Sequence, residues 1–403
     1  MAVGLRAPTA LQSVPGVRLA TCAAGIRYLD RDDLVLIDAG PDAAIAALFT
    51  TNAFCAAPVQ VAREHLASGS ARWLLINAGN ANAGTGRAGV AAARSVCATL
   101  GRVFGAPGQA VLPFSTGVIG EPLPVERMAA VLPVLAAALT EDAWMDAARA
   151  IMTTDTILKG ASRVARLSTG TVTLTGIAKG SGMIHPDMAT MLAFVATDAR
   201  IGSGQLHRFL VQAADDSFNA ITVDGDTSTN DALVGIASGA SGVEVTSPED
   251  CGVFGEALDS LCLELAEAIV RDGEGATKFV RVTVRGGRDR SEARRVAEVV
   301  ALSPLVKTAL FASDPNWGRI LAAVGRAGVV DFMIDRVGIA VNGVEIVSFG
   351  GRAPGYAEAD GQKAFAADEL DIVVDLARGS AEYRKYTCDF SYDYVRINAD
   401  YRS

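Results

Sequence analysis

The first 120 residues consist of short apolar segments separated by turns that are rich in glycine and asparagine. Segments of this length, bounded by turn-forming residues, are typical of buried strands. Two stretches with helical spacing follow, and Thr140, which precedes two acidic residues, is the expected N-cap of the second. The pattern therefore predicts strands at 34–37, 47–50 and 73–76 and helices within 122–139 and 140–153.

Beyond residue 170, strand patterns and helix patterns alternate. Ser247 is expected to cap a long helix that ends near Val270, because a proline follows the serine and an acid stands three positions after it. Asn342-Gly343, between two apolar segments, predicts a hairpin with a two-residue turn. The other expected strands are 171–175, 191–197, 279–285, 370–374 and 392–397, and the other expected helices are 205–218 and 291–301.

These elements predict an α/β protein of the α+β kind, because strands and helices are mixed along most of the chain. A chain of 403 residues, half of them apolar, can bury a large core and exceeds one average domain. We expect a mixed α/β body over residues 1–280 and a smaller, strand-rich C-terminal domain over residues 281–403.

Charge and hydropathy exclude several classes of partner. The formal net charge is −9, whereas a nucleic-acid-binding face needs clustered lysine and arginine, so no nucleic acid is expected. No stretch reaches the roughly 18 uncharged apolar residues that a membrane helix requires, so no membrane partner is expected. The N-terminus lacks the apolar core of a secretion signal.

The six cysteines are widely spaced, form no C-x-x-C motif and have no neighbouring histidine. The chain holds only three histidines, so the sequence predicts no metal site and no cofactor. Free thiols fit a reducing compartment, and we expect a cytoplasmic protein.

One segment, Lys179-Gly-Ser-Gly-Met-Ile-His-Pro-Asp-Met-Ala-Thr190, carries a candidate nucleophile. A threonine hydroxyl needs an adjacent base, and the one base that a threonine can itself supply is its own freed α-amine. Cutting the Ala189–Thr190 peptide bond would create that amine. A threonine that opens an apolar run is, taken alone, more often an ordinary strand residue.

Two other turns contain residues that could take part in catalysis or binding. Thr116 and Gly117 follow an apolar segment and could offer a hydroxyl and a backbone N–H to an oxyanion, although an ordinary loop is the more common explanation. Glu274, flanked by two glycines, would suit a substrate ammonium group. Lys179 could neutralise a substrate carboxylate, although most loop lysines are merely solvated.

Five motifs in this order resemble the ornithine acetyltransferase family of arginine biosynthesis, and the match spans essentially the whole chain. They are the segment from Lys179 to Leu192, Ser-Thr-Gly-Val-Ile-Gly at 115–120, Asp-Gly-Glu-Gly-Ala-Thr-Lys-Phe at 272–279, Asp-Pro-Asn-Trp-Gly-Arg at 314–319 and the closing Arg-Ile-Asn-Ala-Asp-Tyr-Arg-Ser.

The resemblance implies a self-processing fold of the N-terminal-nucleophile type, an αββα sandwich. It implies cleavage between Ala189 and Thr190 into an α chain of residues 1–189 and a β chain of residues 190–403, which stay associated as an α2β2 assembly. Thr190 would be the nucleophile, and Thr116 with Gly117 would form the oxyanion hole. The implied substrate-binding residues are Thr153, Lys179, Thr190, Glu274, Asn398 and Ser403; the family often ends in threonine where this chain has Ser403.

The implied reaction moves the acetyl group of N-acetylornithine to glutamate through an acetyl-threonine intermediate, and acetyl-CoA is a further candidate donor. Two alternatives remain open at this point. One is a self-cleaving aminopeptidase or amidase, in which water accepts the acyl group. The other is a noncatalytic paralogue that keeps the fold.

Overall fold

The computed structural model describes residues 2–185 and 191–400. The predicted cleavage residues Ala189 and Thr190, and the predicted substrate contact Ser403, lie outside these residues. The chain divides into two compact units. Ala7–Asn219 and Asp226–Ile269 form the larger unit, and Met1–Arg6, Ala220–Gly225 and Val270–Ser403 form the smaller unit.

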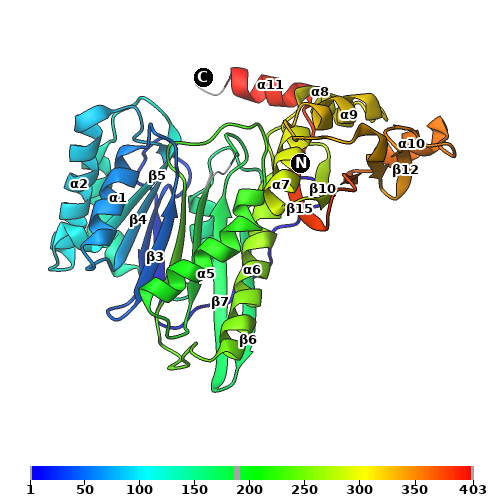
Figure 1. Cartoon of the computed structure of the whole chain (residues 1–403). Coiled ribbons are helices and arrows are strands. Elements are labelled where there is room, and N and C mark those ends of the chain that lie inside the picture. Colours follow the sequence, from blue (N-terminus) through cyan, green and yellow to red (C-terminus); the bar gives the residue numbers. More distant parts are fainter. Residues whose placement is uncertain (1, 186–190, 401–403) are drawn as a thin grey trace. The chain divides into compact units, whose positions relative to one another are not determined.

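The described strands of the larger unit form two sheets (Figure 1). The first has the order β1-β2-β4-β5 and the second has the order β3-β9-β8-β7-β6. The strands of the first sheet are β1 (Arg18–Cys22), β2 (Leu34–Asp38), β4 (Trp73–Asn80) and β5 (Val111–Val118). Those of the second are β3 (Ala44–Phe49), β6 (Lys159–Leu167), β7 (Gly170–Lys179), β8 (Leu192–Thr197) and β9 (Ala232–Ala237).

An apolar core between the two sheets holds the larger unit together. Phe114 of β5 and Phe194 of β8 meet edge to face there, with ring centroids 5.3 Å apart. Both sheets contribute buried aliphatic side chains to this core, including Ile37, Ile76, Ile177 and Val234. Because each strand sends alternate side chains to opposite faces, the two outer faces also need cover.

Helices supply that cover on both outer faces. A second core packs α2 (Gly86–Val103) and α3 (Val125–Ala137) against the first sheet. On the second sheet, glycines on β7 and β9 leave room for leucines of α6 (Pro248–Arg271) and α5 (Ser203–Asp215). The layers are therefore helix, sheet, sheet and helix, and the expected αββα sandwich is confirmed. The remaining helices of this unit are α1 (Ala57–Ala67) and α4 (Trp144–Ala150).

The smaller unit is built on a sheet with the order β13-β12-β11-β14-β10-β15. Its strands are β10 (Phe279–Gly287), β11 (Gly338–Val341), β12 (Val344–Ser348), β13 (Gly351–Arg352), β14 (Glu369–Asp375) and β15 (Ala381–Cys388). Its helices are α7 (Arg290–Ala301), α8 (Pro304–Phe311), α9 (Trp317–Gly325), α10 (Glu358–Phe365) and α11 (Tyr392–Ala399).

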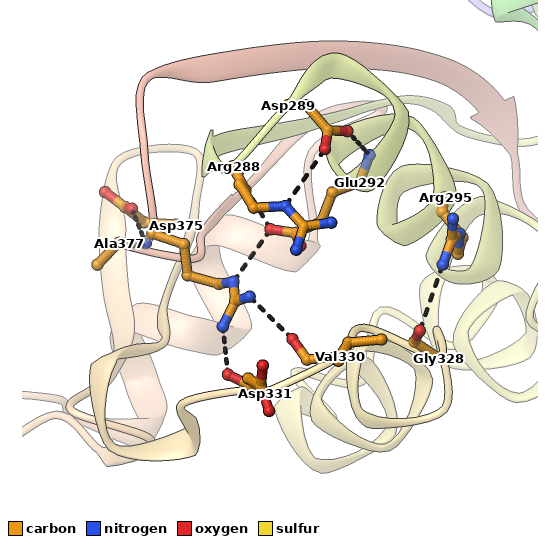
Figure 2. A network of polar contacts seen from close by, with 10 residues as sticks. Arg288, Asp289, Glu292, Arg295, Gly328, Val330, Asp331, Asp375 and Ala377 are labelled. Carbon is orange, nitrogen blue, oxygen red and sulfur yellow. Dashed lines mark hydrogen bonds and ion pairs between the residues drawn. The ribbon is translucent and has the colours of Figure 1, made fainter.

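Polar contacts fix the start of α7 (Figure 2). Asp289 caps the helix by accepting from the backbone N–H of Glu292 at 2.8 Å. The carboxylate of Glu292 accepts from the backbone N–H of Arg288 at 3.0 Å and from Arg378 at 3.1 Å. The guanidinium of Arg378 also donates to the carbonyl of Val330 at 2.8 Å. One buried ion pair thus joins the helix to two neighbouring turns.

Most of the predicted elements are present. Ser247 caps α6 by accepting from the backbone N–H of Asp250 at 3.0 Å, and the helix ends at Arg271. The hairpin at Asn342-Gly343 joins β11 to β12, with φ angles of 48° and 80° at the two turn residues. No helix in the described part of the chain is both long enough and apolar enough to cross a membrane.

Three predictions about secondary structure were wrong. Residues 392–397 form the helix α11 rather than a strand, because Ser391 caps it and accepts from the N–H of Tyr394. Thr140 caps no helix; it pairs with Leu19 in an isolated bridge, and α4 begins at Trp144. The first 120 residues also contain the helices α1 and α2, which the turn-rich pattern did not reveal.

The core between the sheets generates a stability prediction. Phe194→Ala removes a ring that is fully buried between the sheets, and we expect it to lower the free energy of unfolding by about 3–5 kcal/mol. Phe54→Ala is the matched control, because that ring is 71% exposed and its loss should change stability by no more than about 0.5 kcal/mol. Urea unfolding of both variants checks this, and equal losses would contradict the assigned core.

Candidate active site

A small pocket of about 40 Å³ lies in the larger unit, where the ends of several strands meet. Thr116 of β5 and Lys179 at the end of β7 enter it from the two sheets. Met191 and Leu192 at the start of β8, and Asn230 and Asp231 just before β9, complete the side formed by the second sheet. The other lining residues are Gly180, Gly182, Met183, Ile184 and Ser228.

Thr116 and Lys179 are in direct contact in this pocket. The Lys179 ammonium donates to the Thr116 hydroxyl oxygen at 3.1 Å, and both residues are buried. Because the oxygen accepts from the ammonium, the hydroxyl hydrogen can be directed at another acceptor. Two of the predicted site residues, 63 positions apart in the sequence, are thus brought together by the pairing of the two sheets.

Gly117 follows Thr116 at a place where only glycine fits. Its φ is +130°, and a Cβ there would lie 2.2 Å from the carbonyl carbon of Gly79 and 2.6 Å from the N of Asn80. β4 and β5 run parallel, and their register shifts at Gly79 and Asn80. Such an irregularity at a strand end changes the direction of the residues beside it. The close approach of the two backbones therefore defines how Thr116 and Gly117 are presented.

The carboxylate of Asp155 anchors the lysine side of the pocket. It is fully buried and accepts from the Lys159 ammonium and from the Gly180 N–H, both at 2.7 Å. Burial alone would raise its pKa, but the charges of Lys159 and Lys179 and these hydrogen bonds hold the pKa of Asp155 well below its usual range. Asp155 is therefore ionised, and it helps to neutralise Lys179.

Asn230 anchors the threonine side. Its amide donates to the carbonyl of Ser115 at 2.9 Å and to the carbonyl of Ala81 at 2.6 Å. Ser115 in turn donates to the side-chain oxygen of Asn77 on β4 at 2.5 Å. The residue that precedes Thr116 is thus held by Asn77 of β4 and by Asn230, which stands just before β9.

The other predicted site residues fall into three groups. In the smaller unit, Asn398 donates to the carboxylate of Glu274 at 2.9 Å. In the larger unit, the backbone N–H of Thr153 donates to Asp155 at 3.0 Å, which links Thr153 to the Lys179 side of the pocket, although Thr153 does not line it. Ala189, Thr190 and Ser403 belong to the third group, which lies outside the described residues.

Sequence reasoning missed Asp155, Ser228, Asn230 and Asp231. Asp155 lies within Met-Thr-Thr-Asp-Thr, where only Thr153 was singled out. The other three belong to the polar run Asp-Gly-Asp-Thr-Ser-Thr-Asn-Asp at 224–231, which stands directly before the buried strand β9. A run of polar side chains next to a buried strand was the signal that could have identified these three residues. In residues 2–185 and 191–400, no cluster of three or more histidine, cysteine, aspartate or glutamate side chains could hold a metal ion.

The family model and the curated relative that match this chain both belong to the same family. The family model described as the ArgJ family matches residues 18–403. A curated relative from Methylococcus capsulatus, the arginine biosynthesis bifunctional protein ArgJ, is 56% identical over 392 residues, which cover 97% of this chain and 96% of that protein.

Two solved structures of similar proteins each match about half of this chain. The arginine biosynthesis bifunctional protein ArgJ from Bacillus halodurans has a TM-score of 0.50 and 42% identity, covering 52% of this chain and 99% of that chain. The ornithine acetyltransferase from Mycobacterium tuberculosis, solved with ornithine, has a TM-score of 0.39 and 32% identity, covering 46% of this chain and 99% of that chain.

The close approach of β4 and β5 generates a second prediction. Gly117→Ala places a methyl group against the Gly79 backbone, so we expect a loss of about 2–3 kcal/mol of stability, with a lower melting temperature. Gly204→Ala is the control, because its Cβ would meet open space within α5, where alanine is favoured. A Gly117→Ala protein with the same melting temperature as the wild type would contradict the proposed packing.

The buried ion pair of Asp155 and Lys159 leads to a third prediction. Lys159→Met leaves Asp155 without its closest cation, and we expect a cost of about 3–5 kcal/mol in urea unfolding at neutral pH. The cost should shrink under acid, because a carboxyl with a lowered pKa stabilises the fold above its ordinary pKa and loses that contribution as the pH falls.

Arg149→Met is the matched control for Lys159→Met, because its ion pair with Asp146 is exposed to solvent. Its loss should change stability by less than about 1 kcal/mol. Equal effects of the two substitutions would contradict a structural role for the buried pair.

Proposed function

The chain belongs to the ArgJ family, and from that membership and the pocket we propose that it transfers the acetyl group of N-acetylornithine to glutamate in arginine biosynthesis. The observation that carries the proposal is the contact between Thr116 and Lys179 in a chain that is 56% identical to an ArgJ protein over almost its whole length.

The proposed nucleophile is Thr190, freed by cleavage of the Ala189–Thr190 bond. Met191, the next residue in the sequence, lines the pocket. The solved chain from Bacillus halodurans supports division of the precursor, because 99% of it corresponds to 52% of this chain. That share is close to the fraction that residues 190–403 represent.

The proposed cleavage follows from the same hydroxyl. The Thr190 oxygen attacks the carbonyl carbon of Ala189, the peptide bond rearranges to an ester, and water hydrolyses the ester. This leaves a carboxylate on residue 189 and an amine on Thr190. The amine then serves as the base that the hydroxyl needs in the mature enzyme.

In the proposed transfer, Thr190 attacks the acetyl carbonyl of N-acetylornithine. Thr116 and Gly117 stabilise the oxyanion, with the Thr116 hydroxyl polarised by the Lys179 ammonium. Ornithine departs, the acetyl group stays on Thr190, and glutamate then accepts it. Acetyl-CoA is a candidate second donor, in line with the word bifunctional in the name of the Methylococcus relative.

The proposed substrate contacts pair each charged substrate group with a side chain of opposite charge. Lys179 would attract a substrate carboxylate, and Glu274, supported by its hydrogen bond from Asn398, would attract an ammonium group. Thr153 and Ser403 are further proposed contacts. We also propose an α2β2 assembly in the cytoplasm; the free thiols of all six cysteines agree with a reducing compartment.

Two other functions are less well supported. An aminopeptidase or amidase on this scaffold would pass the acyl group to water, so it would hydrolyse N-acetylornithine equally fast with and without glutamate. A noncatalytic paralogue would not need a buried lysine aimed at a threonine hydroxyl, because burying both groups costs free energy.

Substitution of the nucleophile tests the proposal. Wild-type protein should separate into two chains on denaturing mass measurement and form N-acetylglutamate from N-acetylornithine and glutamate. Thr190→Ala should remain one chain of 41.6 kDa and form none, because it has neither hydroxyl nor freed amine. Thr190→Ser, which keeps the hydroxyl, should still cleave. Cleavage of Thr190→Ala at the same bond would contradict the mechanism.

A further inference from the structure

Asp231 lies in the pocket but has no role in the proposed mechanism. It directly precedes β9 and lines the same space as Thr116 and Lys179. Hydrogen bonds of the backbone fix its position, because Thr50 N–H donates to the Asp231 carbonyl at 3.0 Å and Ala232 N–H donates to the Met191 carbonyl at 2.9 Å. The Asp231 carboxyl group is therefore held beside the start of β8.

One oxygen of this carboxyl group lacks a partner. Asp231 is 3% exposed, and its Oδ2 accepts no hydrogen bond from any described residue. An unsatisfied buried acceptor of this kind destabilises the fold, because it has lost its hydrogen bond to water. Among the described residues that line the pocket, Asp231 and Lys179 are the two ionisable ones. A buried acid with one unsatisfied oxygen, in a pocket that also holds Thr116 and Lys179, indicates a role in binding or chemistry.

The surroundings of Asp231 favour its protonated form. Burial raises its pKa well above the usual range, and hydrogen bonds from Ser228 and the charge of Lys179 oppose this only in part. Among the described residues, the charged group that acts on Asp231 is Lys179 on β7, and Lys179 in turn acts on Asp155, which pairs with Lys159. Arg63 of α1 donates to the carbonyl of Thr50, the residue that pairs with the Asp231 backbone.

Acetyl transfer between two amino acids requires a group that donates one proton and later accepts one. The departing amino acid is released as a neutral amine and takes up a proton to become an ammonium ion in water. The incoming amino acid arrives as an ammonium ion and must lose a proton before its nitrogen can attack. A group that gives the first proton and accepts the second would keep the two half-reactions in balance.

We propose that Asp231 is this group, a proton-exchanging catalytic residue that contacts the α-amine of both substrates; the proposal rests on the proposed acetyl transfer. In the first half-reaction, the proton of the Thr190 hydroxyl passes through the Thr190 amine to the leaving nitrogen as the C–N bond breaks. The carboxylic acid of Asp231 then donates its proton to the released amine, which leaves as an ammonium ion.

The second half-reaction restores the acid. The carboxylate of Asp231 accepts a proton from the incoming α-ammonium, and the neutral amine attacks the acetyl carbonyl of acetyl-Thr190. As the ester C–O bond breaks, the second proton of that nitrogen returns through the Thr190 amine to the threonine oxygen. Asp231 ends protonated, Thr190 ends with its hydroxyl, and no external acid or base is consumed.

The test compares two acceptors in single-turnover deacylation. Acetyl-enzyme is prepared with N-acetylornithine, separated from small molecules, and mixed at neutral pH with glutamate or with hydroxylamine, which is already a neutral amine there. Asp231→Asn keeps the shape but cannot exchange a proton. We expect it to slow the reaction with glutamate by ~100-fold and to leave the reaction with hydroxylamine close to the wild-type rate.

Asp198→Asn is the matched control. Asp198 is also a buried acid of the larger unit with a raised pKa caused by burial, but it does not line the pocket. Both reactions of this variant should match the wild type. If Asp231→Asn slows both acceptors equally, or slows neither, the role of Asp231 is overturned. A wild-type protein that forms no acetyl-enzyme would overturn the proposed function itself, and the inference with it.

A measurement on the wild type covers the case in which Asp231→Asn fails to fold or cleave. With Asp231 as proton acceptor, the rate with glutamate should level off well below the pKa of the free α-ammonium group. If solvent removes the proton instead, the rate should rise about tenfold per pH unit up to that pKa, which would overturn the proposal.

Discussion

The pocket depends on the interactions of one buried carboxylate, that of Asp155, with the residues around it. It joins the start of β6, through Lys159, to the turn after β7, through the N–H of Gly180. It also supplies the negative charge that lets Lys179 remain buried beside Thr116. Without a nearby anion, a buried ammonium would tend to lose its proton, and the lysine could no longer polarise the threonine hydroxyl.

The two sheets contribute different parts of the same site. β5 presents Thr116 and Gly117, held by the close contact with Gly79 and by the amide of Asn230. The strands of the second sheet present the ionisable groups at their ends. Because the packing of the sheets sets the distance between these groups, the apolar core around Phe114 and Phe194 also determines the chemistry.

Many of the helices, strands and turns, and part of the candidate site, were predictable from the sequence. Strong local signals, such as the Ser247 cap and the Asn342-Gly343 turn, gave the correct elements, and the motifs around Thr116 and Lys179 identified residues that are in contact. The helix at 392–399 was missed because its alternating aromatic residues resemble a strand, whereas the Ser391 cap decides the outcome. Asp155 and Asp231 were missed because burial and pairing, which make them unusual, depend on residues far away in the sequence.

Thr190 is the proposed carrier of the acetyl group, and Thr116, Lys179 and Asp231, which line one pocket, are the residues proposed to act with it. The most direct test is the mass of the fragment that begins at residue 190, after incubation with N-acetylornithine in the absence of glutamate. We predict one added acetyl group, located on Thr190 and lost when glutamate is supplied. A fragment of unchanged mass, or an acetyl group on another residue, would contradict the account.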